Sequence, residues 1–175
     1  IEEITNTFNL AFSDYFFSFH MTPELMISKM KADKVVLDYS VGVFEDGNLI
    51  ALILHGADDI DNKKVIYNGG TGVIPDKRGR GLTKQMYDCS LPILKEKCFD
   101  NITLDAISKN IQAIKSYEKV GFRIEKELKC YKGQVSLKSE TKYIDIRELV
   151  DYDWGLMQSF WDFIPTWQNS SNVLD

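Results

Sequence analysis

The stretch that decides the fold runs from Val65 to Cys98 and reads VIYNGGTGVIPDKRGRGLTKQMYDCSLPILKEKC. Val65–Ile74 is rich in strand-forming side chains, and the glycines inside it indicate a bulge or a close backbone approach to a ligand. A turn containing Gly79 and Gly81 follows. Apolar side chains then recur at helical spacing, at Leu82, Met86, Cys89 and Ile93. The segment predicts a strand, a glycine-rich turn and a helix from about Gly81 to Cys98, kinked at Pro92 because proline cannot donate to the preceding turn.

A glycine-rich turn that leads into a helix exposes several backbone N–H groups at one point. The helix dipole adds positive potential there, so that an anion is favoured. Basic side chains surround this turn in an otherwise acidic chain: Lys77, Arg78, Arg80 and Lys84. An anion site and a plain turn with solvated bases both fit the pattern. The Walker A motif does not fit, and the dinucleotide fingerprint lacks its third small residue.

Composition narrows the classes of protein. The 175 residues allow one domain with a sizeable core, and 44% hydrophobic and 27% charged residues are typical of a soluble globular protein. A net charge of -5 disfavours a nucleic-acid binder. No apolar run is long enough for a membrane helix. The cysteines form no C-x-x-C pair and the two histidines have no ligand spacing, so we expect reduced thiols, no metal and a cytoplasmic location.

The N-terminal half predicts two helices and three antiparallel strands. The first helix spans Ile4 to Phe17. The second begins after Thr22-Pro23-Glu24, a cap followed by proline and an acid, and ends near Ala32. Strand formers fill Val35–Phe44, and Asp46-Gly47 is a strong two-residue hairpin signal. Further along the chain come a buried strand, a polar loop and the glycine-containing strand: Leu49–Leu54, Asp58–Lys63 and Val65–Ile74.

After the helix that ends near Cys98, the chain alternates again. Asn101–Ile107 reads as a strand. Asn110 caps a helix that ends near Val120, with Gly121 as its stop, and Phe122–Tyr131 reads as one more strand. Strands on both sides of each late helix imply βαβ crossovers. The predicted fold is therefore a mixed α/β sheet with antiparallel N-terminal strands and helices on both faces.

The tail differs in character. We place a domain over residues 1–135 and a second segment over residues 136–175, where Gly133–Thr141 is a polar linker or hairpin and Tyr143–Glu148 reads as a strand. Apolar side chains then fall on one predicted helical face, at Trp154, Met157, Trp161 and Ile164. The domain's own core, a partner subunit such as a second copy, or a further domain are the three ways to cover that face.

Two segments together resemble the GNAT superfamily of N-acetyltransferases. Val73–Thr83 is similar to its motif A, in which Arg/Gln-x-x-Gly-x-Gly/Ala follows a strand ending in Val-x-Pro; Arg78 and Gly81 match, whereas Thr83 departs from the usual small residue. Asn110–Phe122 is similar to motif B. The resemblance covers about residues 8–131, and Tyr143–Leu149 resembles the first strand of another such unit, which would make the chain the first unit of a tandem protein.

The resemblance implies a function and a site. It implies a transferase that moves an acetyl group from acetyl-CoA to a primary amine of a small molecule or protein by direct attack. It implies Tyr117 near the thiol as the catalytic residue, with the pyrophosphate at the turn and the pantetheine arm near Val73, Pro75 and Asn110. The expected cofactor-binding residues are Val73, Ile74, Pro75, Arg78, Gly79, Arg80, Gly81, Leu82, Thr83 and Asn110.

Two other functions stay open at this point. A non-catalytic acyl-CoA-binding or sensing module would have the same fold and would bind the cofactor without consuming it. A nicotinamide-dependent enzyme would bind NAD and not CoA. The sequence singles out neither a general base nor an acceptor, and no nucleic-acid or membrane partner is expected.

Overall fold

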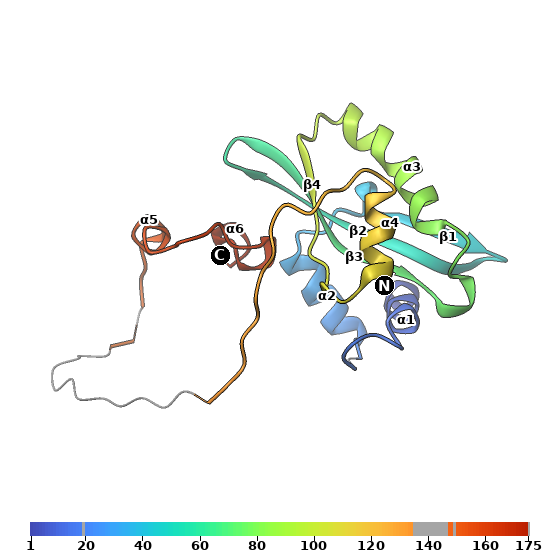
Figure 1. Cartoon of the computed structure of the whole chain (residues 1–175), viewed down its shortest axis with the longest axis horizontal. Helices are drawn as coiled ribbons and strands as arrows, with labels where there is room; N and C mark the ends of the chain where they lie inside the picture. Colours follow the sequence, from blue (N-terminus) through green and yellow to red (C-terminus); the bar gives the residue numbers. More distant parts are fainter. Residues whose placement is uncertain (19, 135–146, 149, 175) are drawn as a thin grey trace. The chain divides into compact units, whose positions relative to one another are not determined.

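The computed structural model describes residues 1–18, 20–134, 147–148 and 150–174 (Figure 1). These residues divide into two compact units, one made of Ile1–Arg123 with Pro165–Asp175 and the other of Ile124–Ile164. Among the described residues, no helix is both long enough and apolar enough to cross a membrane.

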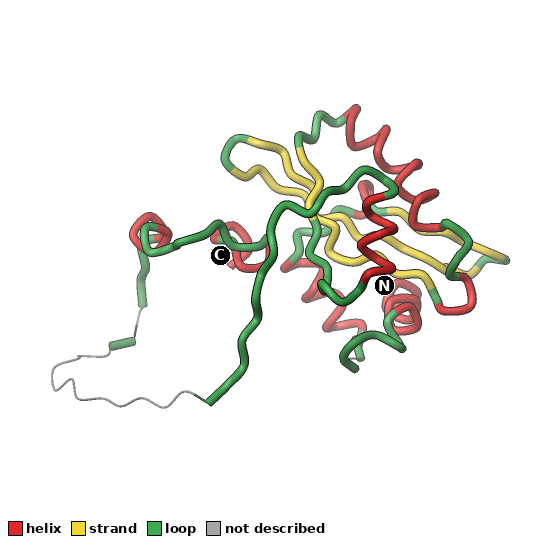
Figure 2. Tube along the Cα trace, in the orientation of Figure 1, coloured by secondary structure: helices red, strands yellow, loops and turns green. Residues whose placement is uncertain are grey.

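The first unit is built on a four-stranded sheet with the order β1-β2-β3-β4 (Figure 2). Strands β1 (Val41–Glu45), β2 (Asn48–Ile60) and β3 (Lys63–Val73) are antiparallel neighbours. Strand β4 (Asn101–Thr103) lies parallel to β3, and the helix α3 (Leu82–Glu96) connects the two. This crossover confirms the predicted mixed α/β class.

Helices cover both faces of the sheet. On one face, α1 (Glu2–Ala11) and α2 (Pro23–Ala32) pack Phe8 and Met26 against leucines of β2. On the other face, α3 packs against Ala51 and Ile53 of β2, and side chains from α4 (Ile111–Glu118) join the same core. Alternate residues of β2 therefore serve two cores, which explains why its sequence is a nearly continuous apolar run.

Both β-hairpins close with two residues in the left-handed backbone region. Asp46 and Gly47 have φ of 51° and 78°, which confirms the predicted hairpin. Asp61 and Asn62, with φ of 50° and 60°, make a second turn of this kind. The predicted loop over Asp58–Lys63 is therefore wrong, because Asp and Asn tolerate this conformation and let β2 and β3 continue to the turn.

Other boundaries also differ from the prediction. Helix α1 ends at Ala11 and not at Phe17, and Ser13 Oγ donates to Leu10 O over 2.8 Å at its end. Val41–Glu45 forms the strand β1 that pairs with β2, Val35 makes an isolated antiparallel bridge to Gly56 of β2, and Leu37–Tyr39 between them forms a 3₁₀ turn. The strand predicted for Asn101–Ile107 stops at Thr103, because the chain beyond it diverges from β3.

The strand predicted over Phe122–Tyr131 is absent, since residues 122–134 are described without any strand pairing. Ile124, Leu128 and Tyr131 there are 63%, 46% and 88% exposed, so the alternating pattern has no neighbouring strand to bury it. The predicted Tyr143–Glu148 strand lies mainly outside the described residues. Helix α5 spans only Trp154–Gln158, so Trp161 and Ile164 do not extend a helical face.

Residues 165–174 fold with the first unit. They contain the 3₁₀ turn η3 (Trp167–Asn169) and the short helix α6 (Ser171–Leu174). Trp167 stacks on Tyr67 of β3 with ring centroids 5.2 Å apart and an interplanar angle of 7°. This stack buries Val65 and Tyr67 on a part of the sheet that the main helices leave open.

Candidate functional site

A cavity opens where β3 and β4 diverge. The two strands pair only between Val65–Tyr67 and Asn101–Thr103, although β3 continues to Val73. The cavity has a volume of about 680 Å³, and its walls include Asn68–Val73 of β3 and the chain just after β4, Leu104–Ala106. The edge of β3 that β4 leaves unpaired can hydrogen-bond an extended ligand as an added strand would.

The backbone of Val73 points into this cavity. Ile74 N donates to Ile50 O of β2 over 3.1 Å. Successive backbone groups of a strand point to opposite edges, so the N–H and C=O of Val73 face away from β2. The Val73 carbonyl accepts a bond of 3.1 Å from Arg78 Nε. The Val73 N–H is therefore aimed at the space between the diverging strands.

A β-bulge shapes the wall of the cavity. Leu54 pairs with Gly70 and His55 pairs with Asn68, so Gly69 is an extra residue in β3. A Cβ at Gly69 would lie 2.7 Å from Asp33 Oδ2, which is closer than real contacts allow. A glycine is thus required at this bulge, because the buried side chain of Asp33, at the C-terminal end of α2, approaches it closely.

The side chain of Asn68 holds this bulge in place. Asn68 is buried, and its Oδ1 accepts from Gly70 N over 3.0 Å. Its Nδ2 donates to Thr71 Oγ1 and to Tyr87 Oη, each over 2.7 Å. The amide therefore makes three hydrogen bonds, two within β3 and one to α3, and fixes the inner wall beside Thr71.

The glycine-rich turn places helix N–H groups at the other end of the cavity. Gly79 and Gly81 have φ of 77° and 72°, and a Cβ on either would have no atom within 4 Å. Gly81 is the N-cap of α3 and has no side chain that could cap the helix; the first helical bond runs from Gln85 N to Gly81 O. The N–H groups of the first helical turn consequently point into open space and can bind an anion.

The basic side chains around this turn are paired with acids. Arg78 binds both oxygens of Asp14, over 2.6 and 2.7 Å. Lys77 and Arg80 share the carboxylate of Glu45, and Lys84 pairs with Asp88. The hydrogen bond from Arg78 lowers the pKa of Asp14, and bonds from Lys77 and then Arg80 lower that of Glu45. The bases around the turn therefore form ion pairs and are not simply solvated, so the backbone N–H groups are the main donors that could bind an anion here.

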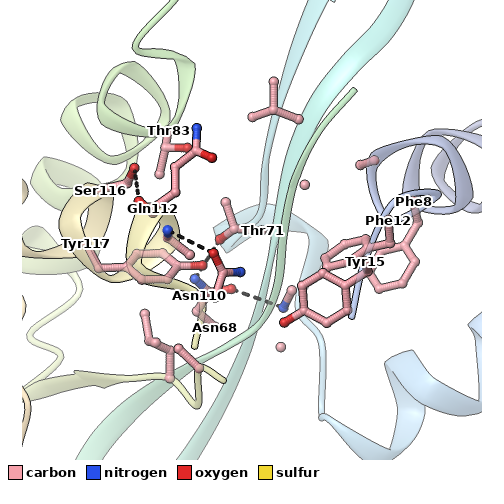
Figure 3. Close-up of a pocket in the computed structure, with 18 of the residues that line it drawn as sticks. Phe8, Phe12, Tyr15, Asn68, Thr71, Thr83, Asn110, Gln112, Ser116 and Tyr117 are labelled. Carbon is pink, nitrogen blue, oxygen red and sulfur yellow. Dashed lines mark hydrogen bonds between the residues drawn. The ribbon is translucent and has the colours of Figure 1, made fainter. Parts of the chain in front are cut away.

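Helix α4 brings two predicted residues to the opposite wall. Asn110 caps it by accepting from Ala113 N over 3.1 Å, as expected. Figure 3 shows Asn110 and Tyr117 projecting from α4 toward Thr71 and Asn68. Burial raises the pKa of Tyr117, hydrogen bonding to Thr71 opposes the rise, and nearby Tyr15 adds to it. The phenol is thus held neutral, as a hydrogen-bond donor, at physiological pH.

Most of the predicted site residues converge on this cavity, whose lining includes Val73, Arg78, Gly79, Gly81, Leu82, Thr83, Asn110 and Tyr117. Three of them do not line it. Ile74 packs into the core with α3, Pro75 begins the 3₁₀ turn η2 (Pro75–Lys77), and Arg80 reaches Glu45. Among the described residues, no group of three or more His, Cys, Asp or Glu could hold a metal ion.

Thr71 and Tyr87 were not predicted as site residues, and Asn68 was not singled out. The Asn-Gly-Gly run at the expected bulge was a usable signal for Asn68, because an amide beside a bulge can bond the exposed backbone. No signal pointed to Tyr87, whose partner Asn68 is 19 residues away in sequence.

Comparison with known proteins identifies the family. The sequence profile of the acetyltransferase (GNAT) family matches residues 3–122. The chain belongs to the GNAT acetyltransferase family. This confirms the resemblance carried by Val73–Thr83 and Asn110–Phe122. Among curated proteins, none matches this chain.

Solved structures of GNAT acetyltransferases share the fold. The aminoglycoside acetyltransferase meta-AAC0020, from an uncultured soil metagenomic sample, is 12% identical with a TM-score of 0.58, over 77% of this chain and 87% of that one. AAC(6')-Iy in complex with a bisubstrate analogue of CoA is 17% identical with a TM-score of 0.56, over 77% of this chain and 91% of that one. An acetyltransferase of Trypanosoma brucei is 18% identical with a TM-score of 0.55, over 75% of this chain and 95% of that one.

Proposed function

We propose that this GNAT protein transfers the acetyl group of acetyl-CoA directly to a primary amine. The observation that carries the proposal is the convergence of three groups on one cavity. These are the unpaired edge of β3, the open N-terminus of α3 and the partly buried phenol of Tyr117. They match, in order, an extended arm, a pyrophosphate and a thioester sulfur.

The cofactor fits these groups without needing free cations. The N–H groups at the start of α3 bind the pyrophosphate, and each charge-assisted hydrogen bond contributes roughly 1.5–3 kcal/mol. The pantetheine arm adds to the open edge of β3 between Asn68 and Val73. The Val73 N–H then faces the thioester carbonyl, where it stabilises the oxyanion that develops during attack.

The acyl transfer forms one carbon–nitrogen bond and breaks one carbon–sulfur bond. The amine nitrogen attacks the thioester carbon, and the carbon–sulfur bond then breaks. The nitrogen loses one proton to water or a base, and the sulfur leaves as a thiolate that gains one proton. Holding both reactants in one cavity converts the reaction into an effectively unimolecular step, which supplies much of the rate.

Tyr117 stabilises the leaving thiolate by hydrogen bonding. An unperturbed phenol has a pKa of about 10 and a thiol about 8.5, so full proton transfer from the phenol is uphill by roughly 2 kcal/mol. Burial raises the pKa of Tyr117 and increases that gap. We therefore assign the phenol as a donor that stays protonated while solvent delivers the final proton.

Replacing Tyr117 with phenylalanine tests this role. We expect Tyr117→Phe to bind acetyl-CoA with a Kd within about twofold of the original and to lose at least tenfold in kcat, since one transition-state donor contributes on the order of 2–4 kcal/mol. Tyr131→Phe is the matched control, because Tyr131 is 88% exposed and not part of the cavity lining. Calorimetry gives Kd, and release of free thiol gives kcat. Unchanged turnover would remove Tyr117 from the mechanism.

The same assay separates the enzyme from a sensing module. A sensor would bind acetyl-CoA and release no thiol with any amine offered. A nicotinamide-binding protein would show a thermal shift with NAD and none with CoA.

A further inference from the structure

The cavity continues past β3 to the face of the sheet that carries α1. The proposed cofactor groups come from α3, α4 and the edge of β3. On the α1 side, the lining comes from α1 and the turns after it, between Phe8 and Phe17, together with Met21 and Lys29. Figure 3 shows Phe8, Phe12 and Tyr15 on one side of β3 and Tyr117 with Asn110 on the other. An acceptor entering from the α1 side would therefore meet a cofactor bound from the α4 side.

This α1 side is unusually aromatic. Four of the ten phenylalanines of the chain lie between residues 8 and 17. Phe8 and Phe12 have ring centroids 4.5 Å apart, and Tyr15 packs edge-on against Phe12, Phe16 and Phe17 at 5.1, 5.3 and 5.4 Å. Phe16 and Phe17 line the cavity and are 54% and 58% exposed. Exposed rings beside a cavity favour a ligand with an apolar surface.

The carboxylates near this wall already have partners. Asp14 forms two bonds to Arg78, and Asp33 is buried against Lys29 and Gln168 Nε2. Asp105 accepts from Tyr67 Oη over 3.5 Å. Two of the partners, Arg78 and Lys29, are themselves cations that line the cavity. A ligand carrying several ammonium groups would meet these cations and would have to compete for each carboxylate.

We propose that the wall formed by Phe8, Phe12, Tyr15, Phe16 and Phe17 is the acceptor subsite, and that the acceptor is a monoamine carried on an aromatic body. The inference rests on the proposed acetyl transfer and names the substrate class of that same site. Aromatic rings stack edge-to-face or offset on such a wall, and each buries a large apolar area. The amine end then points past Gly70 and Thr71 toward Tyr117.

The wall also favours the reactive form of the amine. A primary amine has a pKa of about 10.4, so the ammonium form dominates at pH 7. Apolar surroundings and nearby cations both disfavour that charged form and lower the pKa. The subsite therefore increases the fraction of neutral amine and supplies part of what a general base would do.

A comparison of two amines tests the substrate class. With acetyl-CoA held constant, we expect kcat/KM for 2-phenylethylamine to exceed that for the aminoglycoside tobramycin by at least tenfold, measured by release of free thiol. A preference for tobramycin would overturn the aromatic subsite and leave acetyl transfer intact. Binding of 2-phenylethylamine to the protein with CoA is measured separately by calorimetry. Binding without thiol release would count against acetyl transfer and for the subsite, and absence of binding would overturn the subsite.

Two exposed rings allow a variant test with little risk to folding. We expect Phe16→Ala and Phe17→Ala each to raise KM for 2-phenylethylamine at least fivefold while KM for acetyl-CoA stays constant. Phe44→Ala is the matched control, since Phe44 is 59% exposed and lies outside the cavity lining. If the three variants behave alike, the wall does not bind the acceptor.

Discussion

Removal of the Asn68 side chain is the sharpest test of how the cavity is built. In Asn68→Ala, the bulge loses the three hydrogen bonds that the amide makes to Gly70 N, Thr71 Oγ1 and Tyr87 Oη. A buried N–H left without an acceptor costs about 1–3 kcal/mol, and a lost ordinary bond about 0.5–1.5 kcal/mol. The two hydroxyls can rotate to other partners, so most of the cost falls on Gly70.

We therefore expect Asn68→Ala to lower the free energy of unfolding by about 3 kcal/mol. For a chain of this size, 1 kcal/mol shifts Tm by roughly 2–4 °C, so Tm falls by roughly 6–12 °C. The matched control is Asn48→Ala. Asn48 is exposed and makes one side-chain bond, to Asp46 O over 3.1 Å, so its loss stays within about 0.5 kcal/mol.

Urea unfolding and a thermal melt measure both variants, and amide hydrogen exchange reads the Gly70 N–H directly. Exchange at Gly70 accelerates in Asn68→Ala more than the change in global stability alone requires, because its acceptor is gone. If Asn68→Ala melts within about 2 °C of Asn48→Ala, the amide does not fix the bulge and the reasoning fails.

Two more changes test the anion site and a buried histidine. Gly79→Asp should fold, because Asp46 and Asp61 of this chain already adopt positive φ and a Cβ at Gly79 meets no atom. Its carboxylate should nevertheless raise the Kd for acetyl-CoA at least tenfold, measured by calorimetry. Gly47→Asp, at φ of 78° in the hairpin, should leave this Kd unchanged, and equal effects of the two variants would refute an anion site at the turn. Burial lowers the pKa of His55 below 6.5, so the stability of the folded state is fully present above that pH and declines below it as the unfolded chain takes up a proton, by on the order of 1 kcal/mol per pH unit. His55→Asn keeps a donor for Tyr39 O, to which the ring nitrogen Nδ1 donates over 2.7 Å. This substitution should flatten the decline in stability between pH 7 and 5.5, measured by urea unfolding, whereas substitution of the exposed His20 should not. A decline that persists in His55→Asn would show that another group causes it.

Local signals in the sequence predicted the elements whose ends are set by their own residues. Thr22 caps α2 by accepting from Leu25 N, as Thr-Pro-Glu indicated. Asp46-Gly47 forms its hairpin, and Asn110 and Gly121 bracket α4. In each case the chemistry that stops or starts the element lies within four residues along the chain.

Strand boundaries were harder to predict because a strand needs a neighbour. The alternation of Ile102, Leu104 and Ala106 suited a strand through Ile107, but pairing with β3 ends at Thr103. The apolar pattern of Phe122–Tyr131 likewise met no strand to pair with among the described residues. Periodicity reports which side chains could be buried, and only the tertiary arrangement decides whether a partner edge exists.

For the site as well, local sequence motifs predicted some residues, and others depend on the tertiary arrangement. Motif spacing located the turn at Gly79 and the helix bearing Tyr117, which lie about forty residues apart and face one cavity. It could not locate the contact of Asn68 with Tyr87, or the aromatic wall that we propose as the acceptor subsite. Those depend on the crossing of α3 and α1 over opposite faces of the sheet.

The sequence position of the cations at the turn suggests that they bind an anion, whereas in the structure Arg78 connects elements of the fold. Arg78 donates to Val73 O, Ala11 O and Asp14, and so joins β3 to the end of α1. That connection positions the Val73 N–H on one side and the aromatic wall on the other. Since paired cations add little net charge, the anion site that we propose depends on backbone N–H groups exposed by the glycines. In the function that we propose, the turn would bind the anion through its glycines, while Arg78 holds both halves of the cavity together.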